Sequence, residues 1–193
     1  MIKREDLVGK SQEEIQAVIT EDAQLFAVQI SELASEEEIL NKERELMEVM
    51  AENEKFMKGI EYTLADSVSF DNTQYNKETV GKMIADFIAT QEVEWSYTLG
   101  LFELVKLWKN SNLEKIQYHA YDSTLRILGT LKYKGVESWR KILTVNAYLG
   151  QCHNDYVRDT SYMLYLSQLH NTLIDALKKL HPEMNEEAES VEI

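Results

Sequence analysis

One short stretch of the chain carries side chains suited to nucleophilic catalysis: Cys152, His153, Asn154 and Asp155. A thiolate nucleophile needs a general base within hydrogen-bond reach, and that base normally comes from a distant part of the sequence. Neighbouring residues on a helix point about 100° apart, so Cys152 and His153 would diverge there. We therefore expect Cys152 to be a small buried side chain beside a polar loop or helix start, with no catalytic role.

Known metal and nucleotide motifs are incomplete in this sequence. A carboxylate-bridged di-iron site takes Glu-x-x-His pairs from two helices, because residues three apart share a face. The residues three positions before the four histidines are not acidic: Ile116, Gly150, Ser167 and Lys178. The stretch Gly9-Lys10-Ser11 ends like a phosphate-binding loop, but Arg4 stands where that motif needs glycine. We expect no metal, nucleotide or other cofactor.

Two further groups of residues have acid-base potential. His119 lies among aromatic and acidic neighbours, and His170 lies on the last expected helix with Asp175. For a lone histidine beside helical aromatic residues, we expect a hydrogen-bonded structural role. The neighbours of His119 are Tyr118, Tyr121 and Asp122.

A basic segment spans residues 106–141, with Tyr133 and Trp139 interleaved. Lys and Arg can neutralise phosphates while aromatic rings stack on bases, so this segment could bind nucleic acid. It could also accept an acidic protein partner, including the acidic part of another copy, or be an ordinary solvated surface. Its bases are Lys106, Lys109, Lys115, Arg126, Lys132, Lys134, Arg140 and Lys141.

Charge divides the chain near residue 66. The formal net charge is −14, and residues 1–66 contain 17 acidic against 7 basic residues and only three aromatic ones. A strongly acidic surface is repelled by phosphate backbones and anionic membranes.

Good helix formers are abundant, and the only proline is Pro182. With a single cysteine, no disulfide can form within the chain.

The acidic part carries two helical stripes. Ser11 with Glu14 and Ser35 with Glu38 form capping-box patterns, and we favour a break between two helices at Ser35 over one long rod. The second stripe is a heptad-like seam interrupted by two polar residues, which can fix register and partner choice. We predict a partner-binding seam of Ile39, Glu43, Leu46, Met50, Asn53, Met57 and Ile60. The alternative is that this acidic arm folds back on the third and sixth helices of its own chain.

In residues 67–75 the helical spacing of apolar residues ends and residues that favour turns become frequent, which indicates a linker. Four helices are expected beyond it, over 76–109, 120–132, 136–149 and 155–181, with residues 113–119 ambiguous. The first would have a buried face that includes Trp95, Leu99, Phe102 and Val105. Gly135 and Gly150 are expected as left-handed helix caps.

The expected fold is all-α, a bundle of about five to six helices with a long N-terminal coiled-coil-like hairpin or rod. Its expected parts are an acidic helical arm (1–66), a linker (67–75), an aromatic-rich helical bundle (76–182) and an acidic disordered tail (183–193).

The stretch Thr124–Trp139 resembles segments of small helical proteins from tailed-phage and mobile-element genomes. The resemblance covers this part of the chain alone. It implies a role in a virion or in assembly, and it assigns no functional residue.

These features favour a non-catalytic helical protein that binds other protein chains, through self-association or in a larger assembly. One alternative is a nucleic-acid-associated protein that uses the basic segment. Another is an enzyme or small-molecule binder with a pocket among the aromatic helices, with Cys152, His153 and His119 as the residues to test. We expect no membrane partner and a cytoplasmic location, which would be the host cytoplasm or the virion for a phage protein.

Overall fold

The structure is a computed structural model that describes residues 1–33, 35–90 and 97–181. The chain is mainly α-helical, which confirms the predicted fold class, and its described residues include four short strands. It divides into two compact units, each treated separately below. Unit 1 combines the residues up to Lys58 with those from Val157 onward, and unit 2 is Gly59–Tyr156. Trp95, Pro182 and the expected tail at 183–193 lie outside the described residues.

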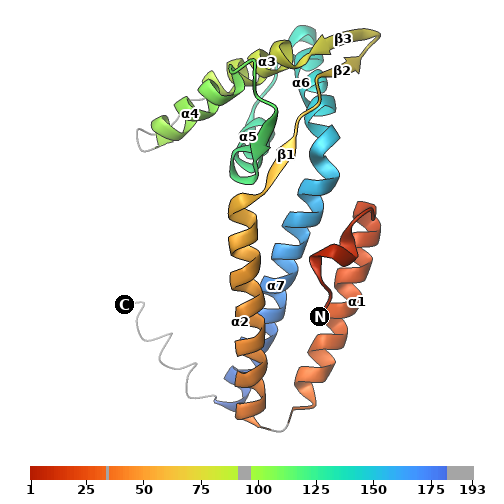
Figure 1. The fold of residues 1–193 in the computed structure, drawn as a ribbon, viewed down its shortest axis with the longest axis vertical. Coiled ribbons are helices and arrows are strands. Elements are labelled where there is room, and N and C mark those ends of the chain that lie inside the picture. The colour runs from red at the N-terminus through yellow and green to blue at the C-terminus, as the bar shows by residue number, and fades with distance from the viewer. Residues whose placement is uncertain (34, 91–96, 182–193) are drawn as a thin grey trace. The chain divides into compact units, whose positions relative to one another are not determined.

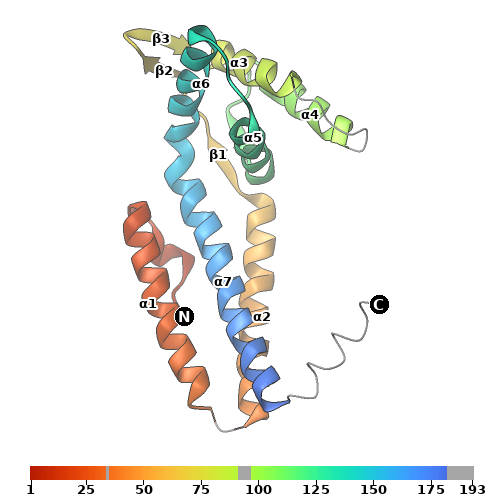
Figure 2. The ribbon, with the colours of Figure 1, turned by 180° about the vertical axis from the view of Figure 1, so that it is seen from behind.

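Unit 1 is built from both ends of the chain. Within it, α7 lies between α1 and α2 (Figures 1 and 2). The first four residues of α7 belong to unit 2, so the boundary between the units falls inside this helix. The elements of unit 1 are a 3-10 helix η1 (Arg4–Leu7), α1 (Gln12–Ser31), α2 (Glu36–Gly59) and α7 (His153–Leu180).

Local capping separates the first two long helices. The Ser11 hydroxyl accepts a hydrogen bond from the Glu14 amide, and the Glu14 carboxylate accepts one from the Ser11 amide. Ser35 and Glu38 repeat this reciprocal pattern at the beginning of α2. Each box satisfies backbone donors that a helix start leaves without an intrahelical acceptor. The predicted break at Ser35 is confirmed.

One apolar core joins the three long helices of unit 1. The stripe on α1 is buried as predicted, and it packs in the same cluster as residues of α2 and α7. The acidic arm therefore folds back on the sixth predicted helix of its own chain, while the third predicted helix contributes nothing to this cluster. The cluster's members from α1 and α7 are Ile15, Ile19, Ala23, Phe26, Ile30, Tyr162, Tyr165, Leu166, Leu169 and Leu173.

Unit 2 contains the strands. β1 (Glu61–Thr63) pairs antiparallel with β4 (Lys115–Gln117), and β2 (Ser67–Phe70) pairs antiparallel with β3 (Thr73–Asn76). Residues 67–75 were expected to be a linker, but they form this second hairpin instead. Asp71 and Asn72 both have positive φ at its turn, a conformation that Asp and Asn tolerate better than most residues. The turn formers in this stretch therefore close a hairpin.

The predicted helix 76–109 is two helices in the structure. They are α3 (Lys77–Ala89), capped by the Asn76 side chain, and α4 (Thr98–Trp108). The beginning of α3 lies against the end of α4, because a Cβ added at Gly81 would lie 2.5 Å from the Trp108 carbonyl oxygen. The helical period continues through both segments, so periodicity alone could not reveal the break.

The remaining helices of unit 2 are α5 (Tyr118–Thr130) and α6 (Val136–Leu149). The prediction for α6 is confirmed to the residue. Gly135 has φ 84° but stands before α6, at its N-cap, and Gly150 is right-handed with φ −54°. The left-handed cap expected at Gly150 is therefore wrong, because a 3-10 helix η3 (Gly150–Cys152) follows α6 directly.

Buried tyrosines hold unit 2 together. The Tyr121 hydroxyl donates to the Leu149 carbonyl at 2.7 Å, and the Tyr148 hydroxyl donates to the Ala65 carbonyl at 2.8 Å. Each tyrosine hydroxyl thus donates a hydrogen bond to a backbone carbonyl far away in the sequence, while its ring packs in the core. Burial raises the pKa of Tyr148 to about 12 and also raises the pKa of Tyr121.

The contact between α3 and α4 gives a test by substitution. We expect Gly81→Ala to lower the free energy of unfolding by about 1–3 kcal/mol, because the new methyl group meets backbone that cannot rotate away. Gly129→Ala in α5 is the matched control, since no heavy atom lies within 4 Å of its added Cβ. Urea denaturation measures both. A Gly81→Ala variant as stable as the control would contradict the close approach of the two helices.

The buried phenols predict a loss of stability in alkali. A tyrosine ionises at about pH 10 in the unfolded chain, so a higher pKa in the fold makes the folded state hold the proton longer. The stabilisation is fully present below about pH 10 and is lost as the pH rises toward the folded pKa values. Denaturant midpoints measured from about pH 8 to 12 should fall, and Tyr148→Phe should weaken that fall. A flat profile would contradict the prediction.

Candidate functional site

A hollow of about 1010 Å³ lies between α4 and α5 in unit 2. Its volume and apolar lining are typical of a site that receives a ligand or an apolar side-chain cluster. Its apolar lining includes Leu101, Leu104 and Leu107 from α4 and Ala120 and Ile127 from α5. Its polar lining includes Glu103, Lys106, His119, Ser123 and Arg126.

α4 is predominantly apolar: seven of its eleven residues are apolar, and its two charged residues, Glu103 and Lys106, lie on one side. A helix with so much apolar surface is normally buried. Yet among its eleven residues, all of which the structure describes, only Trp108 is buried. Leu99 is 72% exposed and Phe102 is 60% exposed. The apolar residues of α4 are Leu99, Leu101, Phe102, Leu104, Val105, Leu107 and Trp108.

Trp108 anchors the end of this helix. Its indole nitrogen donates to the Thr124 hydroxyl of α5 at 2.9 Å, and its backbone carbonyl lies against α3 at Gly81. The buried face predicted for the helix 76–109 included Leu99, Phe102 and Val105. That prediction is wrong for Leu99 and Phe102, and Val105 is half-buried. The anchor thus holds α4 on unit 2 by one end, while much of its apolar surface faces water.

Charged groups surround the hollow. Lys106 lies 3.9 Å from Glu103 on the same helix, and Arg126 pairs with Asp122 at 2.8 Å. Asp122 also accepts a 2.7 Å hydrogen bond from the Tyr156 hydroxyl. His119 is exposed, stacks edge-on against Tyr118, and lines the hollow. The border of the hollow therefore presents both signs of charge.

The basic segment is largely neutralised by acidic side chains within the chain. Among its eight bases, Lys106, Arg126 and Lys141 pair with acids one helical turn away. Lys115 pairs with Glu61 across the β1–β4 ladder, and Arg140 pairs with Asp71. Within the part of the chain that the structure describes, no ion pair involves Lys109, Lys132 or Lys134. An acidic neighbour lowers the local positive potential at each of these five bases, but pairs between exposed side chains are weak.

The predicted partner-binding seam lies largely inside the chain. Ile39, Leu46 and Met50 pack in or against the core of unit 1, and Glu43 lies 3.5 Å from His170 of α7. This polar interruption thus contacts the chain's own last helix. The other seam residues, Asn53, Met57 and Ile60, are also buried, with Ile60 in unit 2. These side chains are not exposed for a partner.

Cys152 is buried and makes a hydrogen bond to the backbone. The thiol donates to the Thr63 carbonyl at 3.1 Å and has its pKa raised by burial. A raised pKa disfavours the thiolate that attacks substrates. His153 is exposed at the beginning of α7, and neither Cys152 nor His153 lines the hollow. The interpretation of Cys152 as a buried structural residue agrees with this geometry.

The described residues contain no cluster of histidine, cysteine or carboxylate side chains placed to hold a metal ion. His170 faces Glu43, and Asp175 is exposed on α7. Among the described helices, none combines the length and the apolar character needed to cross a bilayer.

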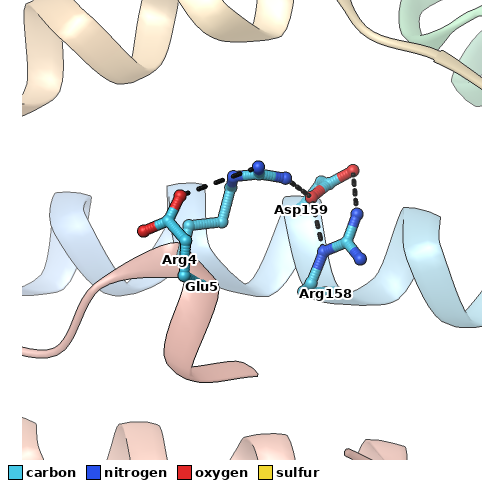
Figure 3. Close-up of polar contacts among 4 residues, drawn as sticks. All are labelled: Arg4, Glu5, Arg158 and Asp159. Atoms are coloured by element: carbon cyan, nitrogen blue, oxygen red, sulfur yellow. Dashed lines mark hydrogen bonds and ion pairs between the residues drawn. The ribbon is translucent and has the colours of Figure 1, made fainter. Parts of the chain in front are cut away.

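Unit 1 contains a buried ionic cluster that sequence reasoning missed (Figure 3). Asp159 of α7 is 1% exposed and accepts hydrogen bonds from Arg4 at 3.0 Å and from Arg158 at 2.9 Å. The Arg4 guanidinium also lies over the Phe56 ring of α2, 3.7 Å from its centroid. Arg4 is far in sequence from both Phe56 and Asp159, so no local spacing of residues could have predicted this cluster. This cluster fastens the N-terminal segment to α2 and α7, which is a structural role.

No family model, curated protein or solved structure matches this chain. The hollow and the exposed α4 surface therefore remain the features from which a function can be argued.

The ionic cluster is tested by removing its anion. We expect Asp159→Asn to lower the free energy of unfolding by about 2 kcal/mol, because two arginines lose the negative charge that they pair with, and an amide donor replaces one acceptor oxygen. The loss should be smaller than for a fully buried pair, since the arginine side chains are partly exposed. Glu5→Gln is the matched control. Glu5 is exposed and lies 3.8 Å from Arg4, so its ion pair is weak and its removal should cost little. A control as damaging as Asp159→Asn, in urea denaturation, would contradict the assignment.

Proposed function

We propose that this protein is a non-catalytic helical protein that works by binding other protein chains, and that it binds them through the α4–α5 surface of unit 2. One observation carries the proposal: α4 is predominantly apolar, yet Trp108 alone among its residues is buried. Contiguous exposed apolar surface of this kind marks interaction sites on soluble proteins. A partner that covered Leu99 and Phe102 would gain about 25 cal/mol for each Å² of apolar surface removed from water.

The surroundings of α4 support a protein partner. Interfaces combine an apolar centre containing aromatic residues with a polar border, and here Phe102 and Tyr97 are exposed near Glu103, Lys106 and Arg126. The chemistry found elsewhere also favours a binding role, because the Cys152 thiol is buried, donates to the Thr63 carbonyl, and has its pKa raised by burial. Affinity would come from apolar packing, and charge would set orientation and partner choice.

The proposal is tested by comparing the native mass of complexes isolated with the protein and with a variant. We expect Leu99→Ser with Phe102→Ser to lose any association that the unchanged protein forms, because both side chains are exposed on α4. Leu143→Ser is the matched control, since Leu143 is a 50% exposed leucine on α6. Size-exclusion chromatography with light scattering gives the masses, against 22.4 kDa for one chain.

Two outcomes would contradict the proposal. One is a 22.4 kDa species at every protein concentration, with no other chain bound. The other is an association that the Leu143→Ser control disrupts as much as the α4 variant does.

A further inference from the structure

The exposed side of α4 is a single stripe, named here the α4 outer face. It consists of Leu99, Phe102, Glu103 and Lys106, which follow one another at i, i+3, i+4 and i+7 and therefore share one side of a helix. All four are exposed, so most of the surface of each side chain faces water. The stripe runs beside the α4–α5 hollow, which Glu103 and Lys106 also line.

The charges on the α4 outer face are self-complementary. Glu103 and Lys106 lie symmetrically about the point between Leu104 and Val105. If two copies of α4 pack antiparallel about a twofold axis through that point, Glu103 of each copy faces Lys106 of the other. A twofold interface uses the same patch on both copies, so a patch of this kind must carry both signs in such an arrangement. Parallel packing would instead place Glu103 against Glu103, and like charges in contact are unfavourable.

The same register also matches the apolar residues. With Glu103 opposite Lys106, Phe102 of each copy lies at the same level along the helix as Leu107 of the other, and Leu107 lines the hollow beside the α4 outer face. One helix thus offers both an apolar ridge, at Leu99 and Phe102, and an apolar groove beside it. Each copy would place its ridge against the groove of its partner, which covers both features at once.

We propose that the occupant of the α4–α5 hollow is a second copy of this chain, docked antiparallel along α4 with Glu103 and Lys106 paired across the twofold axis. The inference rests on the proposed function, because it names the partner for the same surface. The intrahelical contact of Glu103 with Lys106, at 3.9 Å between exposed side chains, is weak and leaves both groups able to pair across an interface.

A charge exchange tests this register. Glu103→Lys leaves two bases on each α4, and Lys106→Glu leaves two acids, so we expect each variant alone to self-associate on the order of tenfold more weakly than the unchanged protein. When the two variants are mixed in equal amounts, every cross-axis pair is again an acid with a base. We expect the mixture to recover dimers that contain one copy of each variant, which native mass spectrometry distinguishes by mass.

The matched control makes the same charge changes on another helix. Glu137 and Lys141 form an exposed pair on α6 at 2.8 Å, so Glu137→Lys and Lys141→Glu should each leave self-association unchanged. Variants at 103 and 106 that associate as well as the unchanged protein would overturn the inference. A mixture no stronger than either variant alone would also overturn it.

The outcomes separate this inference from the function on which it rests. If the purified protein stays monomeric, yet Leu99→Ser with Phe102→Ser abolishes binding of another protein, the second copy is excluded and the proposed function stands. A monomer whose hollow takes up a small apolar molecule, detected as a thermal shift absent in the α4 variant, would overturn the inference and the protein-partner proposal together.

Discussion

Burial of one side of α7 is the interaction on which unit 1 depends. Tyr165, Leu166, Leu169 and Leu173 supply a common apolar surface, and residues of α1 and α2 pack in the same cluster. An amphipathic helix gains most of its stability from packing its apolar side, so α1 and α2 have no core until the last helix is present. Unit 1 therefore requires both ends of the chain. The Arg4–Asp159 contact and the hydrogen bond from the Ile2 amide to the Tyr165 hydroxyl add polar links between the same two ends.

The two units use their apolar residues differently. In unit 1 the apolar stripes of α1, α2 and α7 are largely buried against one another. In unit 2, α3 and α6 have buried faces, but α4 contributes a single anchor, Trp108, and leaves Leu99 and Phe102 in water. Stability alone would not favour such a helix, because its exposed apolar groups gain nothing from folding. Its composition is accounted for if the surface has a role in binding.

Local signals made part of this fold predictable from sequence, and long-range contacts made the rest unpredictable. The break at Ser35 and the bounds of α6 follow from capping residues and apolar spacing within a few positions. The heptad-like seam was visible too, but periodicity identifies an apolar stripe without naming what covers it. The covering helix, α7, begins 94 residues after α2 ends. The same limit applies to α4, where helical spacing predicted a buried face that included Leu99 and Phe102, and the fold leaves both exposed.

The route of the chain through the two units has a further meaning. Unit 2 is an insertion between α2 and α7 in the sequence, and its own ends meet: the Cys152 thiol donates to the Thr63 carbonyl, and the rings of Tyr62 and Tyr156 are 6.4 Å apart. An inserted segment whose two ends lie close together can be accommodated between two helices with little strain. The entropy lost on closing such a loop grows only slowly with its length. Unit 2 is therefore a self-contained insertion, so the proposed α4–α5 binding surface can change in evolution while the three-helix core of unit 1 keeps its sequence.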